Sequence, residues 1–178
     1  MKRNSTPAQQ RGVSLIETVM TMAVLAVTTG TLLPGLSSMP QRHRLEGATA
    51  QLETEMQYAR GLAVMERRAV RFSFRADAGQ SCYVIHTGGP NACVCQGEAA
   101  VCTGTAEALR TVAYTTSGGL HVASNSSSFM FDPVKGTVTP TATIELGNAR
   151  GDALRLVVNI LGRVRSCTPT GMAGHKAC

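Results

Sequence analysis

The sequence predicts an α+β protein in which a long N-terminal helix packs on an antiparallel β-sheet or sandwich head. An apolar run extends from Val13 to about Leu36, and an amphipathic segment over residues 37–68 follows it. The remaining residues, 69–178, form short alternating segments separated by turn residues, which is typical of a β-rich head. A chain of 178 residues has room for one ordinary domain with an additional element.

Composition limits the kinds of ligand that this chain can hold. Tryptophan is absent, and there are only 4 phenylalanines and 3 tyrosines, so an aromatic cofactor cavity or a base-stacking platform is hard to build. No cofactor is predicted. The net charge is +6 and arginine outnumbers lysine, and the planar guanidinium fork suits phosphate. The alternative is that these arginines are simply a solvated surface.

The N-terminus has the charge pattern of a membrane-anchored protein. Residues 1–12 are polar and carry Lys2, Arg3 and Arg11, whereas Glu17 is the one ionisable residue of the apolar run. Residues 13–36 reach the roughly 20 residues that cross a hydrocarbon core. Because positive charges precede the run, we expect a single-pass anchor in the inner membrane with the head on the periplasmic side.

The helix is expected to continue beyond the apolar run. Its amphipathic half has apolar residues at intervals of three and four, namely Leu45, Ala48, Leu52, Met56, Ala59 and Ala63. A single helix from Val13 to Arg68 would be roughly 80 Å long. Proline in a helix interior removes a hydrogen bond, so a break between Pro34 and Pro40 is left open.

The head begins with an alternating segment at Val70–Arg75, as expected for a half-buried strand. Further strands are predicted at 82–86, 109–115, 120–123, 129–132, 141–146 and 154–160. Turn residues such as Gly88-Gly89-Pro90-Asn91 and Lys135-Gly136 separate them.

The junction between the leader and the apolar run resembles the prepilin-peptidase site of type IV pilins and type II secretion pseudopilins. The matching residues are Gly12 followed by Val13-Ser14-Leu15-Ile16-Glu17. The resemblance implies that residues 1–12 are a leader peptide cut between Gly12 and Val13, and that Val13 becomes N-methylated. It also implies that Glu17 acts in filament assembly, where the α-amino group of Val13 is its expected partner. The alternative is that Ser14 and Glu17 form a helix capping box.

The order of leader, long helix, many short strands and basic C-terminal strand resembles the FimT/GspH type of minor pilins and pseudopilins. Pro34 also lies where pilins of this superfamily commonly have a proline. The resemblance implies that prepilin peptidase and other pilins are partners. It further implies that the protein becomes extracellular in the assembled pilus.

The C-terminal part carries the string Gly162-Arg163-Val164-Arg165 after an apolar strand. Residues two apart share a face of a strand, so Arg163 and Arg165 are expected to project together and contact neighbouring phosphates. The string resembles the DNA-binding motif of the FimT branch, which captures DNA for natural transformation, so DNA is a predicted partner. The alternative is an exposed strand end that binds nothing.

The 6 cysteines all lie outside the membrane-anchor region, as expected for disulfides in an oxidising compartment. A Cys167–Cys178 bond would close a loop that presents Lys176 beside the two arginines, and Lys176 is therefore included in the predicted DNA site. The central cysteines are Cys82, Cys93, Cys95 and Cys102. A zinc site among them is disfavoured by spacing. Disulfides allow three pairings, and a bond between Cys93 and Cys95 is the least favourable of them.

Three functions fit this pattern. The first is a minor type IV pilin that binds DNA, the second is a GspH-like minor pseudopilin of a type II secretion system, and the third is a membrane-tethered periplasmic domain with a binding or enzymatic role. The arginine motif and the basic tail favour the first. Catalysis is not predicted, because His121 near Ser124–Ser128 has no evident third group to orient it.

Overall fold

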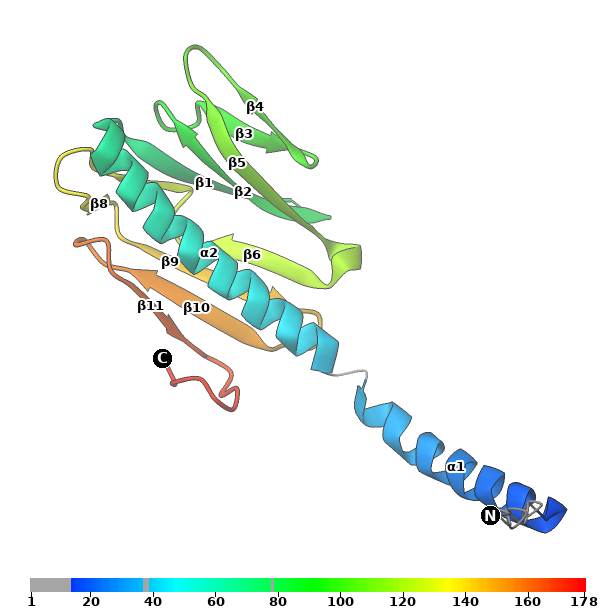
Figure 1. Ribbon diagram of the computed structural model, residues 1–178. Helices are drawn as coiled ribbons and strands as arrows, with labels where there is room; N and C mark the ends of the chain where they lie inside the picture. The colour runs from blue at the N-terminus through cyan, green and yellow to red at the C-terminus, as the bar shows by residue number, and fades with distance from the viewer. Residues whose placement is uncertain (1–13, 37–38, 78) are drawn as a thin grey trace, which may run out of the picture. The chain divides into compact units, whose positions relative to one another are not determined.

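The structure is a computed structural model that describes residues 14–36, 39–77 and 79–178. The chain divides into two compact units, Met1–Met39 and Pro40–Cys178. The first contains helix α1 (Leu15–Leu36), and the second contains helix α2 (Met39–Glu66) from Pro40 onward together with all the strands (Figure 1). The second is called the globular unit below.

Helix α1 is an apolar helix, and the side chains of its residues 15–28 are exposed. Leu15, Ile16, Met20 and Met22 are each at least 64% exposed. The helix continues through Pro34 to Leu36, and residues 37–38 lie outside the described part of the chain. Within the described residues, no helix is both long and apolar enough to cross a membrane. The span expected over residues 13–36 stays a prediction.

Helix α2 has the buried stripe that its sequence predicts. Pro40 lies in the first turn, where its missing N–H is tolerated. Ala48 of the predicted stripe is only partly buried, and the others are fully buried: Leu45, Leu52, Met56, Ala59 and Ala63. The helix ends at Glu66 because Arg67 adopts a φ of 51°, in the left-handed region, and the Arg68 N–H donates back to the Ala63 carbonyl at 3.1 Å.

The strands form two main antiparallel sheets and one hairpin. The first sheet has the order β5-β2-β1-β7-β8, the second has the order β11-β10-β9-β6, and β3 pairs with β4 alone. The bounds are β1 Val70–Asp77, β2 Gln80–Thr87, β3 Cys93–Gln96, β4 Ala99–Cys102, β5 Ala108–Thr115, β6 Leu120–Ser124, β7 Ser128–Phe131, β8 Val138–Thr139, β9 Ala142–Asn148, β10 Ala153–Val158 and β11 Val164–Cys167. Every strand predicted from alternation is present, whereas β3, β4 and β8 were not predicted.

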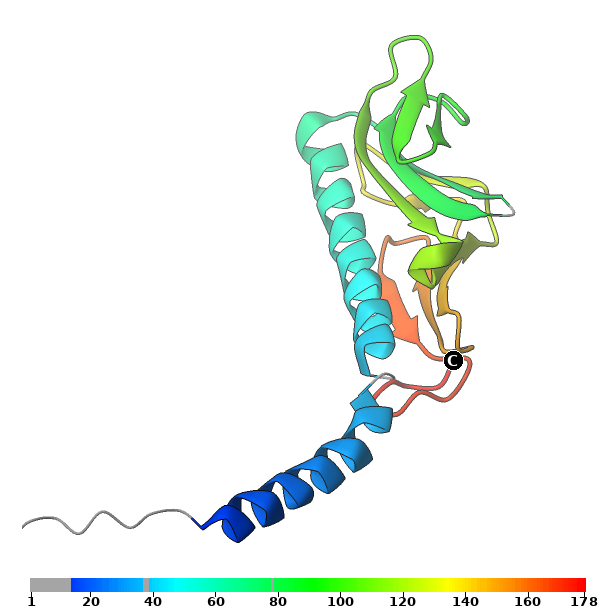
Figure 2. The same cartoon turned by 90° about the vertical axis from the view of Figure 1, so that its right-hand side faces the viewer.

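Both sheets contribute to one core under α2. Figures 1 and 2 show the helix lying along one side of the two sheets. Phe72 of β1 stacks on Phe129 of β7 with ring centroids 5.0 Å apart, and Ile144 and Leu156 enter the same cluster from the second sheet. The predicted α+β class is confirmed, in the form of two sheets that share one helix.

A polar cluster sits beside this core, between α2 and the first sheet. The Glu55 carboxylate is only 8% exposed, and it accepts hydrogen bonds from the Tyr83 hydroxyl at 2.7 Å and the Gln51 amide at 2.9 Å. Arg110 of β5 forms an ion pair with the same carboxylate. Burial, followed by the bond to Glu55, raises the pKa of Tyr83, so its hydroxyl stays a donor.

All 6 cysteines form disulfides. Cys93 and Cys102 are bonded across the β3–β4 hairpin, and Cys82–Cys95 ties this hairpin to β2. The structure thereby selects one of the pairings that the sequence left open. Because the four central thiols are bonded to each other, none is available as a thiolate ligand for a metal.

We expect Leu52→Ala to destabilise the globular unit by about 2–5 kcal/mol, because it leaves a cavity where the helix meets both sheets. Met65→Ala on the same helix is the matched control, since Met65 is 82% exposed and its truncation should change stability by less than about 0.5 kcal/mol. Urea unfolding with the disulfides intact measures both variants. Equal effects would contradict the assignment of this face as the core contact.

Candidate nucleic-acid interface

The predicted arginine motif lies at the start of an edge strand. β11 pairs with β10 only and forms one edge of the second sheet. Val164, opposite the buried Val158, packs against the core. Arg165 is opposite Val157, which is 39% exposed, so the arginine side chain belongs to the outer face of the sheet.

Arg163 lies in the turn before β11 rather than in the strand. Asn159 organises this turn through its side-chain carbonyl, which accepts the N–H groups of Leu161 at 3.1 Å and Arg163 at 2.9 Å. The Gly162 N–H donates to the Asn159 carbonyl at 2.9 Å, and the Asn159 N–H donates to the Arg163 carbonyl at 3.1 Å. The backbone that carries Arg163 is therefore fixed by four hydrogen bonds to one residue.

Gly162 is buried and separates the arginines from the body of the protein. Its φ is 72°, and a Cβ at this position would lie 2.7 Å from the Gly136 carbonyl oxygen and 3.0 Å from Arg60 Nε. The Arg60 Nε–H in turn donates to that carbonyl at 3.0 Å. Both the bend and the close approach therefore require glycine. Gly162 thus fixes the backbone next to Arg163, and its own part in the predicted DNA site stays a prediction.

The two guanidinium groups of the motif are exposed. Neither Arg163 nor Arg165 takes part in an ion pair within the described residues, whereas Arg42, Arg68, Arg75, Arg110 and Arg155 do. Arg163 and Arg165 therefore keep their side-chain donors available to a ligand. Paired donors on an exposed edge can bind phosphate oxygens without reading bases.

The C-terminal loop places Lys176 at the far end of β11. Cys167 is bonded to Cys178, and the Thr168 N–H donates to the Lys176 carbonyl at 2.8 Å. The Lys176 side chain is exposed. Arg163 and Lys176 thus flank the edge strand, with Arg165 between them.

The same loop is attached to the beginning of α2 through Glu46. The Glu46 carboxylate is 3.4 Å from His175 Nε2 and 3.0 Å from Arg42 Nε, and the Arg42 guanidinium also donates to the Ala173 carbonyl. The hydrogen bond from Arg42, with smaller contributions from His175 and His43, lowers the pKa of Glu46 although desolvation opposes it.

The predicted processing site is only partly within the described residues. Gly12 and Val13 lie outside them, so cleavage and methylation there stay predictions. Glu17 lies in the first turn of α1 and is exposed, and its backbone N–H donates to the Ser14 carbonyl at 3.0 Å. The assembly role of Glu17 also stays a prediction.

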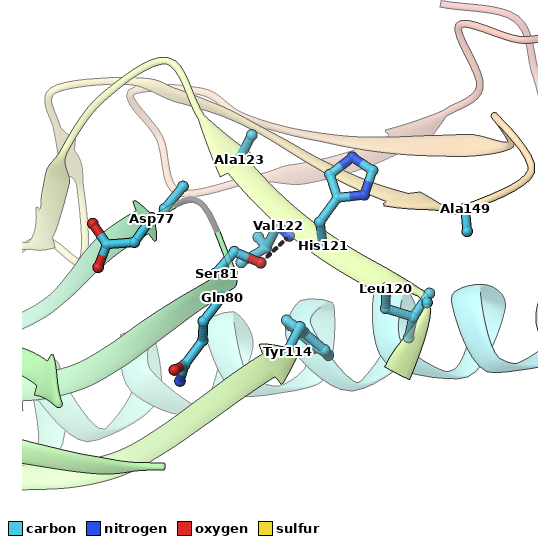
Figure 3. Close-up of a pocket in the computed structure, with 11 residues that line it drawn as sticks. Asp77, Gln80, Ser81, Tyr114, Leu120, His121, Val122, Ala123 and Ala149 are labelled. Carbon is cyan, nitrogen blue, oxygen red and sulfur yellow. Dashed lines mark hydrogen bonds between the residues drawn. The ribbon is translucent and has the colours of Figure 1, made fainter. Parts of the chain in front are cut away.

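His121 lines a pocket of about 300 Å³ beside Ser81 and Tyr114 (Figure 3). The imidazole lies over Gly147, where a side chain would collide with the ring. The Ser81 hydroxyl accepts the Val122 N–H at 2.9 Å. Over residues 14–36, 39–77 and 79–178 no hydrogen bond joins His121 to a serine or a carboxylate.

Arg60 and Gly136 are the residues that sequence analysis did not connect with this site. In the sequence, Arg60 lies between the stripe residues Ala59 and Ala63 of the amphipathic segment, and Gly136 belongs to a predicted turn. Their contact with Gly162 joins three segments that are far apart in the chain. A local sequence pattern does not predict a contact between such distant segments. The sequence shows the glycines at residues 136 and 162, but not that they approach each other.

Comparison with known proteins identifies related families and folds. The family model described as "Type II transport protein GspH" matches residues 48–162, which is more than half of the chain. Among solved structures, the minor pilin FimU of Pseudomonas aeruginosa is 21% identical, with a TM-score of 0.47 and coverage of 71% of this chain and 90% of that one. The minor pseudopilin EpsH of the Vibrio cholerae type 2 secretion system is 10% identical, with a TM-score of 0.47 and coverage of 71% and 98%. No curated protein sequence matches the chain.

We expect Gly162→Ala to destabilise the globular unit more than Gly171→Ala. Both glycines have a similar positive φ, 72° and 75°, but a Cβ at residue 171 would meet no atom within 4 Å. The conformational penalty of about 1–2 kcal/mol is common to both, whereas the collision at residue 162 adds about 1–3 kcal/mol. Urea unfolding measures the difference. Equal losses would show that the close approach to Gly136 is unimportant.

The ion pairs of Glu46 predict a pH-dependent contribution to stability. Because its pKa in the folded protein is below the ordinary value of 4.5, the contribution is complete above that value and is lost as the pH falls through the lowered pKa. Glu46→Gln should therefore lower the free energy of unfolding by about 0.5 kcal/mol at pH 7, and the difference from wild type should vanish in acid. A difference independent of pH would contradict this account.

Proposed function

Because the chain belongs to the GspH family, the type IV pilin-like minor pilins and pseudopilins, we propose that it is a minor pilin that joins a type IV pilus and binds DNA without sequence specificity. The observation that carries the proposal is the pair of exposed guanidinium groups of Arg163 and Arg165, held at a sheet edge and free of ion pairs among the described residues. Such a protein would support DNA uptake in natural transformation.

The chemistry of this edge favours contact with the phosphate backbone. A guanidinium group donates to two phosphate oxygens at once, and a fixed backbone reduces the entropy lost on binding. The phenylalanines of the chain are Phe72, Phe74, Phe129 and Phe131, and they stack together in or against the core. They cannot act as a base-stacking platform, so we expect little preference for sequence and binding of duplex DNA.

Assembly into a filament is assigned to the N-terminal unit. Helix α1 exposes a long apolar surface, which is suited to other apolar helices or to lipid rather than to water. We propose that prepilin peptidase cuts the chain between Gly12 and Val13 and that Val13 is then methylated. Glu17 would make the assembly contact. Before assembly the protein would be held in the inner membrane with its globular unit in the periplasm, and after assembly it would be extracellular.

The second candidate is a minor pseudopilin in the tip of a type II secretion system. The description of the matching family, a type II transport protein, favours it. In that role the edge of β11 would contact other pseudopilins or secreted protein. Both candidates are structural subunits, and we propose no enzymatic reaction for either.

The globular unit is suited to testing DNA binding in isolation. Both hydrophobic clusters and all three disulfides lie within residues 40–178, so this unit contains the interactions that its fold requires. Fluorescence anisotropy with labelled duplex DNA at two salt concentrations measures its affinity. We expect binding that weakens as salt is raised, because phosphate contacts release counterions.

We expect Arg163→Gln with Arg165→Gln to abolish most of this binding and to reduce the slope of log K against log salt by about 1.8, or about 0.9 for each phosphate contact. The matched control is Arg44→Gln with Arg75→Gln, which removes the same net charge at exposed positions outside the motif. An equal loss of affinity in both double variants would mean that DNA binding depends on net charge alone and not on the motif. Absence of binding by the wild-type unit at low salt would favour the secretion role.

A further inference from the structure

We propose that the DNA-binding surface continues from the arginine motif onto the turn between β7 and β8, where Lys135 is a further phosphate contact. This inference rests on the proposed function, since it extends the same site. It assigns a ligand-binding role to a residue outside the Gly-Arg-x-Arg string, in a part of the chain that the sequence analysis treated only as a turn.

The β7–β8 turn and the β10–β11 turn form a single surface at the end of the globular unit that carries Arg163. The Val138 N–H donates to the Ile160 carbonyl at 2.9 Å, which joins the end of the β7–β8 turn to the beginning of the β10–β11 turn. Gly136 and Gly162 approach so closely that no side chain fits between them. Lys135 and Arg163 are the residues adjacent to these two glycines, so the contact between the turns brings the two cations into one neighbourhood.

Arg60 fixes the two turns relative to each other. Its Nε–H donates to the Gly136 carbonyl at 3.0 Å, and the same side chain lies against Gly162. Because Arg60 extends from α2, whose buried stripe lies in the core, the turns are attached through it to the helix that packs on both sheets. The relative position of Lys135 and Arg163 is therefore set by the fold rather than by flexible loops.

The Lys135 side chain is exposed at a defined position. Asp132 holds its turn through one carboxylate oxygen, which accepts the N–H groups of Val134 at 2.9 Å and Lys135 at 2.8 Å. These bonds lower the pKa of Asp132, so its carboxylate is ionised at neutral pH. The charge of Lys135 also contributes, less than these bonds, to the lowered pKa of Asp132. No ion pair within 4.0 Å holds the Lys135 ammonium to this carboxylate, so the ammonium group can contact phosphate.

The four cations follow the edge of the second sheet in order. Lys135 and Arg163 lie at one end, Arg165 follows on β11, and Lys176 lies beside Thr168 at the other end. The four residues of β11, Val164–Cys167, cover about 13 Å at about 3.3 Å per residue. An edge of this length can contact more than one phosphate of a DNA backbone that runs along it.

The test compares Lys135→Gln with Arg44→Gln in the oxidised globular unit, using labelled duplex DNA at several salt concentrations. Both variants lose one exposed positive charge, but Arg44 lies at the opposite end of α2 from Arg60. We expect Lys135→Gln to weaken binding several-fold and to reduce the salt slope by about 0.9. Arg44→Gln should leave the slope unchanged, and Lys135→Arg should retain wild-type affinity.

The outcomes separate this inference from the proposed function. If the double arginine variant loses binding while Lys135→Gln behaves like Arg44→Gln, the extension to the β7–β8 turn is wrong and the arginine site stands. If the wild-type unit binds no DNA, or the double arginine variant binds normally, the proposed function itself fails. The melting temperature of Lys135→Gln should match that of wild type, since its side chain makes no ion pair.

Discussion

The buried face of α2 is the constraint on which the rest of the globular unit depends. Neither sheet is closed on itself, and apolar residues of both sheets join the buried face of this helix in one core. Leu52 and Met56 occupy the middle of that face. The Glu55 carboxylate adds a directional restraint, because its bonds to Tyr83 and Arg110 would be broken if the helix rotated about its axis. A buried carboxylate without these partners would be strongly unfavourable.

The same helix sets the geometry of the candidate DNA site. Arg60 lies on α2 next to the buried Ala59, and its guanidinium reaches the Gly136 carbonyl beside Gly162. The position of Arg163 therefore depends on the packing of α2 in the core, on the hydrogen bond from Arg60 and on Gly162. At the other end of the helix, Glu46 restrains the C-terminal loop that carries Lys176. The basic edge is thus attached to the helix at both ends.

The two units of the chain have opposite surface chemistry. Helix α1 exposes apolar side chains, whereas the globular unit buries most of its apolar residues and exposes its motif arginines. Exposed apolar surface of this kind marks a contact with another apolar partner. This division is consistent with the proposed role as a filament subunit, in which the N-terminal unit would hold the subunit in the assembly and the globular unit would be presented to the surroundings.

The sequence by itself determined the α2 stripe, the strands with clear alternation and the presence of disulfides, because these depend on local periodicity and on residue type. The β3–β4 hairpin was missed because each strand has only four residues, with a single β-branched residue, Val94 or Val101, in each. Only the tertiary structure decided that Cys82 pairs with Cys95, and that Arg163 lies in a turn held against Gly136. Such contacts join residues distant in the chain, and their geometry depends on how the sheets pack under α2, which no local pattern encodes.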